Sequence, residues 1–355
     1  MTSIGIIGAS SQVGASVALF LQKEKSVSVT CYVRSSYSEV FFELQGIDCR
    51  QIDLRDDAGL REKIGSMDVI LDFGYPAGQL HEILGRSKDN IGQLLRVMKK
   101  GSAYFYMSSI MAYGMPENEK WIGHYRIPRT SYAYIKRSIE KFTIREGKKQ
   151  GIRVYNFRLG QVHGFLQSVN GSFRKKLSDS VVAKIDGRPD DPANIIFIHP
   201  LCEAIMECAA GKHPPGLYTL VASPQWTLQE LYDYYVRYYK LPVRLVFCPA
   251  ATKKKKKGFL QMGIDLAKPY RSLLETYVLM RFPSLAVRLK GGFRQSQLSQ
   301  QQGSSLDGLE YIDFNLLGTP PFRMIAGLTT APEKVFGIEK ECEEHYNALI
   351  KAGRQ

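Results

Sequence analysis

The sequence lacks any long apolar run. Nowhere in its 355 residues is there a stretch of about 18 apolar side chains, the length that a membrane-spanning helix needs. Its N-terminus also lacks a basic leader and a cleavage-site pattern, and it begins at once with the apolar run Ile4–Ile7. These absences predict a protein that stays in the cytoplasm.

Cysteine is scarce and scattered. The six cysteines show no paired metal-ligand spacing, and Cys202 and Cys208 are too far apart along one expected helix to form a tetrahedral site by themselves. Free thiols in a reducing compartment are the simplest interpretation, and no metal site is expected.

Acidic residues are few relative to basic ones. The formal net charge is +14, and the stretch 253–294 holds eleven Lys and Arg residues against Asp265 and Glu275, an excess of nine. Such a segment indicates an anionic partner. It predicts either a helix packed on its own lobe or peripheral contact with an acidic membrane surface. No nucleic-acid-binding motif accompanies the charge, so nucleic acid is not an expected partner.

The N-terminal half alternates strand-like and helix-like segments. The expected strands are 4–8, 27–34, 48–53, 67–73, 102–108 and 153–159. Helical or polar stretches separate them, and one helix begins near Tyr132. This alternation is typical of βαβ units and predicts an α/β fold with a doubly wound parallel sheet.

A glycine-containing turn separates the first expected strand from the first helix. Gly8 permits a tight turn, and Gly14 allows the helix to pack closely on the sheet. Backbone N–H groups and a helix N-terminus at this place suit a pyrophosphate. The residues expected to contact a dinucleotide here are Gly8, Ser10, Ser11, Gln12, Val13 and Gly14.

Arg34 closes the second expected strand, where a dinucleotide fold meets the adenosine ribose. An acidic residue there would bind the ribose 2′-hydroxyl, whereas an Arg suits a 2′-phosphate. Ser35 and Ser36 add hydroxyl donors. The position therefore favours NADP over NAD.

Two hydroxyl side chains, Ser108 and Ser109, end the fifth expected strand, and Tyr132 and Lys136 follow four residues apart. Residues at i and i+4 share one helix face, so the ammonium would lie near the phenol and lower its pKa. The Ser109 hydroxyl can hold a substrate oxygen while Tyr132 moves the proton. We expect Ser109, Tyr132 and Lys136 to be catalytic.

These motifs together resemble the NAD(P)-dependent epimerase/dehydratase group, the extended branch of the short-chain dehydrogenase/reductases. The resemblance covers roughly residues 1–245. Its pieces occur in family order: the glycine turn, Asp53-Leu54, Asn90-Ile91-Gly92, Ser108-Ser109, Tyr113-Gly114, Tyr132-x3-Lys136, Arg158 to Gly164, Phe197-Ile198-His199 and Gly216 to Thr227.

The resemblance implies roles for further residues. Asp53 and Leu54 would flank the adenine, and Asn90 would support the active site from below the sheet. It adds Gly74 and Ser108 to the cofactor-binding set, together with Tyr132 and Lys136. A turn role for Asp53 and a capping or packing role for Asn90 are the alternatives.

The resemblance also implies the domain organisation. A Rossmann-type NAD(P)-binding domain would span 1–165, with a return segment at about 194–222. A smaller, mixed substrate lobe would comprise 166–193 and 223–355 and include the basic C-terminal extension. Members of the family dimerise through the helices that here carry Asn90 and Tyr132, which implies a homodimer.

The chain departs from the family pattern at several positions. Ser11 replaces the usual middle glycine, and Ile110-Met111 replaces the acidic pair of the sugar 4,6-dehydratases, which argues against that reaction. Gln161 replaces a frequent Asn, and no Arg for a substrate diphosphate precedes His199. The substrate is therefore held differently or is not a UDP-sugar. For His163 and His199 a structural role is favoured over proton transfer.

Three functions remain open at this point. The first is an epimerase or oxidoreductase that uses NADP or NAD and acts on a hydroxyl or keto group of a sugar or sugar nucleotide. Its substrate would be an anionic or sugar-like small molecule. The second is an NADPH-dependent reductase of a non-sugar or lipid-linked carbonyl compound. The third is a regulator that binds the dinucleotide without turnover, although a pure binder has no need of all three catalytic residues.

Overall fold

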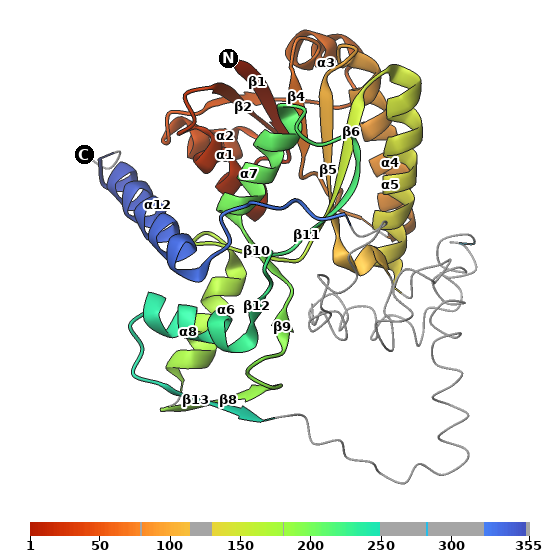
Figure 1. The fold of residues 1–355 in the computed structure, drawn as a ribbon. Coiled ribbons are helices and arrows are strands. Elements are labelled where there is room, and N and C mark those ends of the chain that lie inside the picture. Colours follow the sequence, from red (N-terminus) through yellow and green to blue (C-terminus); the bar gives the residue numbers. More distant parts are fainter. Residues whose placement is uncertain (79, 114–129, 180, 249–281, 283–322, 353–355) are drawn as a thin grey trace, which may run out of the picture.

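The computed structural model describes residues 1–78, 80–113, 130–179, 181–248, 282 and 323–352. The larger lobe is built around a parallel sheet in the order β11-β6-β5-β4-β1-β2-β3 (Figure 1). Its strands are β1 (Thr2–Ile7), β2 (Val27–Val33), β3 (Asp48–Gln51), β4 (Val69–Asp72), β5 (Ala103–Ser109), β6 (Arg153–Leu159) and β11 (Gly216–Leu220). The central strands are nearly continuous apolar runs because helices cover both faces of the sheet.

Two layers of helices enclose this sheet. One layer contains α3 (Asp57–Ile64), α4 (Leu80–Val97) and α5 (Ser131–Gln150), and the other contains α1 (Gln12–Leu21), α2 (Ser36–Glu43) and α7 (Ile198–Ala209). The predicted doubly wound α/β fold is therefore confirmed. The strand order reverses between β1 and β4, and in such folds ligands bind at the carboxyl ends of the strands beside this point.

The smaller lobe combines helices with short strands. Its elements are β7 (Gln161–His163), α6 (Ser168–Ser178), β8 (Val182–Asp186), β9 (Pro192–Ala193), β10 (Ile195–Phe197), β12 (Trp226–Thr227), α8 (Leu228–Tyr238) and β13 (Arg244–Cys248). Aromatic side chains dominate its core, in which Phe197 contacts both Trp226 and Tyr234. A capping box between Thr227 and Glu230 starts α8.

The last helix, α12 (Pro332–Ala352), contributes to both cores. Cys342 belongs to the apolar cluster of the larger lobe, and Val335 belongs to that of the smaller lobe. Between them, the buried carboxyl group of Glu339 accepts a hydrogen bond from the backbone N–H of Phe165 at 3.0 Å. The terminal helix therefore ties the two lobes together.

The basic segment 253–294, with the helical pattern that it contains, lies outside the described residues apart from Phe282. Among the helices that the structure describes, none combines the length and apolarity needed to cross a membrane.

Candidate active site

The glycine turn after β1 is held in a shape that excludes larger residues at two positions. Gly8 has φ +69, and a Cβ there would lie 2.8 Å from the backbone nitrogen of Gly74. At Gly14 a Cβ would lie 2.7 Å from the carbonyl oxygen of Gly8. Ser11 caps α1, because its hydroxyl accepts the N–H of Gly14 at 3.1 Å. Ser11, which stands where the family usually has its middle glycine, thus stabilises the start of α1.

A cavity of about 300 Å³ opens beside this turn at the carboxyl ends of β1, β2 and β4. Seven of the predicted cofactor-binding residues line it: Gly8, Ser10, Ser11, Arg34, Leu54, Gly74 and Asn90. We call this cavity the cofactor groove. The other seven predicted residues do not line it: Gln12, Val13, Gly14, Asp53, Ser108, Tyr132 and Lys136.

Asp53 and Gln12 are held by other parts of the chain. The carboxylate of Asp53 binds Arg55 through two side-chain hydrogen bonds of 3.1 Å, which lower the pKa of Asp53. The backbone carbonyl of Gln12 accepts from Gln167 at 3.0 Å, and its side chain accepts from the N–H of Ser168. Gln12 therefore links the glycine turn to the start of the smaller lobe.

The expected catalytic residues come from two elements that meet at the same end of the sheet. Ser109 ends β5, and its hydroxyl accepts the N–H of Met111 at 3.3 Å. Thr130 caps α5, which places Tyr132 in its first turn and Lys136 one turn further on. The Lys136 Nζ lies 5.7 Å from the centroid of the Tyr132 ring and donates to the carbonyl of Met107 at 2.7 Å. The predicted shared helix face is therefore present.

Tyr75 and Tyr106 connect this group to the cofactor groove. Both line the groove, and their ring centroids lie 5.4 Å and 4.9 Å from the Lys136 Nζ. The Tyr75 ring is also 5.9 Å from that of Tyr132. The Tyr106 hydroxyl is buried and has no hydrogen-bond partner among the described residues. It is a polar group available to a molecule bound in the groove.

The pKa values at this site differ from the sequence-based expectation. Burial raises the pKa of Tyr132 to about 12, and the nearby Tyr75 adds to the rise, while a hydrogen bond with Ser109 opposes it. The lowering expected from Lys136 is not seen, and desolvation has the largest effect on the Tyr132 pKa. Burial also lowers the pKa of Lys136 to about 8, against the opposing charges of Asp72 and Glu140. Tyr132 keeps 36% of its surface exposed, so water screens part of the effect on it.

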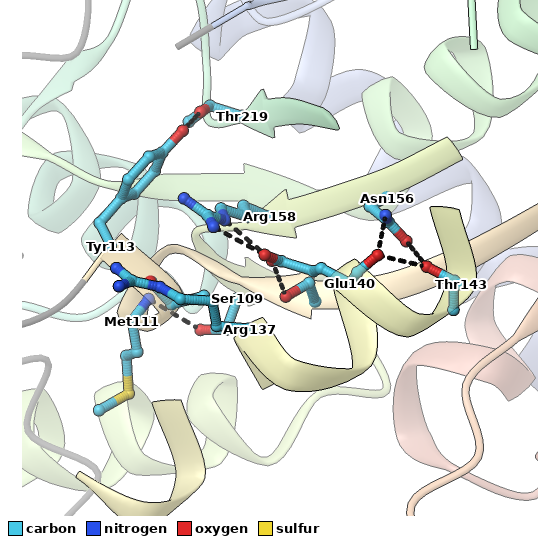
Figure 2. Close-up of polar contacts among 11 residues, drawn as sticks. Ser109, Met111, Tyr113, Arg137, Glu140, Thr143, Asn156, Arg158 and Thr219 are labelled. Carbon is cyan, nitrogen blue, oxygen red and sulfur yellow. Dashed lines mark hydrogen bonds and ion pairs between the residues drawn. The ribbon is translucent and has the colours of Figure 1, made fainter. Parts of the chain in front are cut away.

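Glu140 is a site-supporting residue that the sequence analysis missed. Figure 2 shows its carboxylate facing the Arg158 guanidinium. The Ser108 hydroxyl donates to it at 2.6 Å, and the Arg158 guanidinium donates twice, at 2.8 Å and 2.7 Å. Its signal in the sequence is an acidic residue four positions after Lys136, on the buried face of the same helix. Ser108 therefore contacts this ion pair, and its predicted place on the cofactor stays untested.

The two candidate histidines have structural partners. His163 is fully buried between Tyr235, 2.5 Å from its Nδ1, and Gln161, 3.1 Å from its Nε2. Burial lowers the pKa of His163 to about 3, so the ring is neutral. His199 lies 3.4 Å from Glu203. These contacts support the structural role that was favoured for both. Among the residues described, no group of three or more His, Cys, Asp or Glu could hold a metal ion.

The sheet order and the glycine turn at its switch point are those of a nicotinamide-dinucleotide enzyme of the extended short-chain dehydrogenase type. The chain belongs to the NAD dependent epimerase/dehydratase family, whose model matches residues 4–197. The predicted family, enzyme class and nicotinamide cofactor are thereby confirmed. No curated protein matches the chain in sequence.

Solved structures show the same fold. UDP-N-acetylglucosamine 4-epimerase from Bacillus cereus is 14% identical, with 72% of this chain and 91% of that chain covered and a TM-score of 0.50. UDP-glucuronic acid 4-epimerase from the same organism, in complex with NAD, is 14% identical, with 70% and 86% covered and a TM-score of 0.54. UDP-N-acetylglucosamine 4-epimerase from Methanobrevibacter ruminantium M1, in complex with UDP-N-acetylmuramic acid, is 16% identical, with 71% and 86% covered and a TM-score of 0.53.

Proposed function

We propose that the chain is an NAD(P)-dependent epimerase or oxidoreductase that acts on a hydroxyl or keto group of a sugar nucleotide. The observation that carries the proposal is the placement of Tyr132 and Lys136 on one face of α5, joined to the cofactor groove by Tyr75 and Tyr106. The UDP-sugar 4-epimerases among the structural neighbours support the substrate class.

The residues present fit a dinucleotide. Gly8 and Gly74, whose backbones pack too closely for a Cβ at Gly8, both line the groove, and the unpartnered Tyr106 hydroxyl offers a polar contact. A bound nicotinamide would take up or return the hydride. The chain's own residues would supply the proton transfer: Tyr132 exchanges the proton with the substrate oxygen and Ser109 holds that oxygen. The charge of Lys136 would stabilise the Tyr132 phenolate when it forms.

Arg34 favours a second candidate, an NADPH-dependent reductase whose carbonyl substrate is not a sugar or is lipid-linked. Arg34 is exposed, lines the groove and has no acidic partner among the described residues. Asp53, the nearest acid expected at the adenosine end, is already bound to Arg55. A free guanidinium at this place suits a 2′-phosphate.

Titration of the purified protein with NADPH and NADH, followed by nicotinamide fluorescence, tests both candidates. The protein is then incubated with each cofactor and with a panel of UDP-sugars and non-sugar carbonyl compounds, and the products are separated by chromatography. An epimer formed without net change in NAD(P)H supports the epimerase, and stoichiometric loss of NADPH supports the reductase. Binding of neither dinucleotide would exclude both.

Other expectations remain proposals. Contact of segment 253–294 with acidic membranes predicts sedimentation with anionic vesicles that weakens with added salt. Equal binding to neutral vesicles would remove the basis of this idea.

A homodimer through α4 and α5 predicts twice the monomer mass in gel filtration, and the half-exposed Ile144 on α5 is an available contact. The cytoplasmic location and the division of the chain into domains likewise stay predictions.

A further inference from the structure

Tyr106 carries a buried hydroxyl that has no partner. The residue lies in β5 and is 2% exposed, and its hydroxyl forms no hydrogen bond within the part of the chain that the structure describes. Burying a hydroxyl without a hydrogen bond costs free energy, because its bonds to water are lost and nothing replaces them. A phenylalanine would fill nearly the same volume without that cost. Packing alone therefore does not account for this hydroxyl.

Other buried tyrosines of the same region do have partners. The Tyr104 hydroxyl, two residues earlier on the same strand, donates to the carboxyl group of Asp72 at 2.5 Å. The Tyr32 hydroxyl donates to the backbone carbonyl of Lys63 at 2.6 Å, although Tyr32 also lines the cofactor groove. The chain thus satisfies two comparable hydroxyls internally and leaves that of Tyr106 to the groove that it lines.

Tyr106 and Arg34 lie at opposite ends of the cofactor groove. Both line it, but Arg34 follows β2 and Tyr106 belongs to β5, three places away in the sheet order β5-β4-β1-β2. Neighbouring strands are about 4.8 Å apart, which separates the two strands by roughly 14 Å. The Tyr106 ring lies 4.9 Å from the Lys136 Nζ. With the adenosine beside Arg34, as the sequence predicts, the Tyr106 end of the groove receives the nicotinamide half.

The Tyr106 phenol keeps its proton in the folded chain. Burial raises the pKa of Tyr106 well above its ordinary value of 10, and the nearby Tyr132 adds to the rise. A neutral phenol can donate one hydrogen bond and accept others. The nicotinamide half of a dinucleotide offers uncharged partners of both kinds, namely its ribose hydroxyls and its carboxamide. The hydroxyl therefore suits this half by its chemistry as well as by its place.

We propose that the Tyr106 hydroxyl binds the nicotinamide half of the dinucleotide, which adds Tyr106 to the cofactor-binding residues. The inference rests on the proposed function only for the presence of a dinucleotide in the groove, and the identity of the substrate does not enter it.

The test compares Tyr106→Phe with Tyr32→Phe, which removes the hydroxyl of a groove-lining tyrosine that is already bonded within the chain. Isothermal titration calorimetry measures the affinities for NADPH, NADH and ADP. We expect Tyr106→Phe to weaken NADPH and NADH binding by the same factor, about 5- to 10-fold, the usual contribution of one neutral hydrogen bond. ADP lacks the nicotinamide half, so its affinity should stay at the wild-type value. Tyr32→Phe should leave all three affinities unchanged.

The stability of the ligand-free protein is the second readout. The urea midpoint should be higher in Tyr106→Phe than in wild type, because the variant removes an unpaired buried hydroxyl. It should be lower in Tyr32→Phe, which takes the hydrogen bond away from the Lys63 carbonyl. A tyrosine with a purely structural role would instead lose stability with its hydroxyl and would not discriminate between NADPH and ADP.

Wild-type affinity for both dinucleotides in folded Tyr106→Phe would overturn the inference, and so would an equal loss of affinity for ADP. A lower urea midpoint, or a Tyr106→Phe protein that does not fold, would do the same, since it would show that the hydroxyl is bonded within the chain.

The two proposals fail separately. A selective loss of dinucleotide affinity in Tyr106→Phe, in a protein whose wild type turns over no UDP-sugar or carbonyl compound, would remove the proposed function and leave the role of Tyr106. Turnover of such a compound by wild type, with unchanged dinucleotide affinity in Tyr106→Phe, would remove the role of Tyr106 and leave the function.

Discussion

Glu140 and Arg158 form a two-pronged ion pair in the interior of the larger lobe, directly behind the strand end that carries Ser109 (Figure 2). Both side chains are less than a tenth exposed, and the Arg158 guanidinium also lies 4.1 Å from the centre of the Tyr113 ring. The Tyr113 hydroxyl in turn lies 2.5 Å from that of Thr219 on β11. Because Glu140 also accepts the Ser108 hydroxyl, the pair joins α5, β6 and the end of β5 beside the candidate catalytic residues.

Glu140→Gln should destabilise the protein by about 3–5 kcal/mol, because it leaves the buried Arg158 without a countercharge. Urea unfolding followed by circular dichroism measures the change. Adding Arg158→Met to Glu140→Gln should recover part of the loss, since the uncompensated charge is then gone. A loss below about 1 kcal/mol in the single variant, typical of an exposed pair, would contradict the buried role of this contact.

Tyr132→Phe should lower turnover by about 100- to 10,000-fold, the usual contribution of a positioned acid–base group. Cofactor affinity should stay nearly unchanged, because the ring and its contact with Tyr75 remain. Steady-state kinetics and nicotinamide fluorescence titration give the two values. Tyr134→Phe, on another face of the same helix, is the control and should keep wild-type activity. Turnover retained in Tyr132→Phe would place the acid–base group elsewhere.

Arg34→Ala should weaken NADPH binding about 10- to 100-fold and leave NADH binding nearly unchanged, because a hydrogen-bonded charge contact is worth about 1.5–3 kcal/mol. Arg55→Ala is the control: its guanidinium binds Asp53, so its loss should affect the two cofactors alike. Fluorescence titration of wild type, Arg34→Ala and Arg55→Ala with NADPH and NADH measures the affinities. If NADPH and NADH lose affinity equally in Arg34→Ala, the 2′-phosphate does not reach this residue.

Glu339→Gln should change how stability depends on pH. Burial raises the pKa of Glu339 from its ordinary 4.5 to about 8, with the charge of Glu343 adding to the rise and the N–H of Phe165 opposing it. The neutral carboxyl is thus favoured in the folded state. Its stabilising contribution is complete below the unfolded pKa and is lost as pH rises through about 8.

Relative to Glu339→Gln, the wild-type free energy of unfolding should therefore fall between about pH 5 and about pH 8. The expected difference is on the order of 2–4 kcal/mol, since one pKa unit is worth about 1.4 kcal/mol. Denaturant unfolding at several pH values measures it. Glu341→Gln, an exposed position on α12, is the control and should follow wild type. Parallel curves for Glu339→Gln and wild type would show that Glu339 is ionised in the folded protein.

Local patterns in the sequence predicted the fold and the relative placement of the candidate catalytic residues. Strand β6 occupies the predicted residues, and the other strands of the N-terminal half differ from prediction by a few residues at their ends. The glycine turn and the shared helix face of Tyr132 and Lys136 depend on neighbours within one turn of the chain, so spacing alone could specify them.

Contacts between distant segments were decided only by the tertiary structure. Glu140 meets Ser108 and Arg158 across separations of 32 and 18 residues, and Asp72 meets Tyr104 across 32. No periodicity encodes such pairings, because they arise when the strands of a parallel sheet are placed side by side and a helix is laid over them. The sequence could name the residue types, but it could not name their partners.

The charge states at the site were also decided by the tertiary structure, because they depend on how deeply each group is buried. Spacing placed the Lys136 ammonium near the Tyr132 phenol and predicted a lowered phenol pKa, yet the folded chain raises it to about 12 and lowers that of Lys136 to about 8. Desolvation is a property of everything packed around a group, including strands far away in the chain. The sequence thus determined which groups could exchange a proton, and the tertiary structure decided at what pH each of them carries its charge.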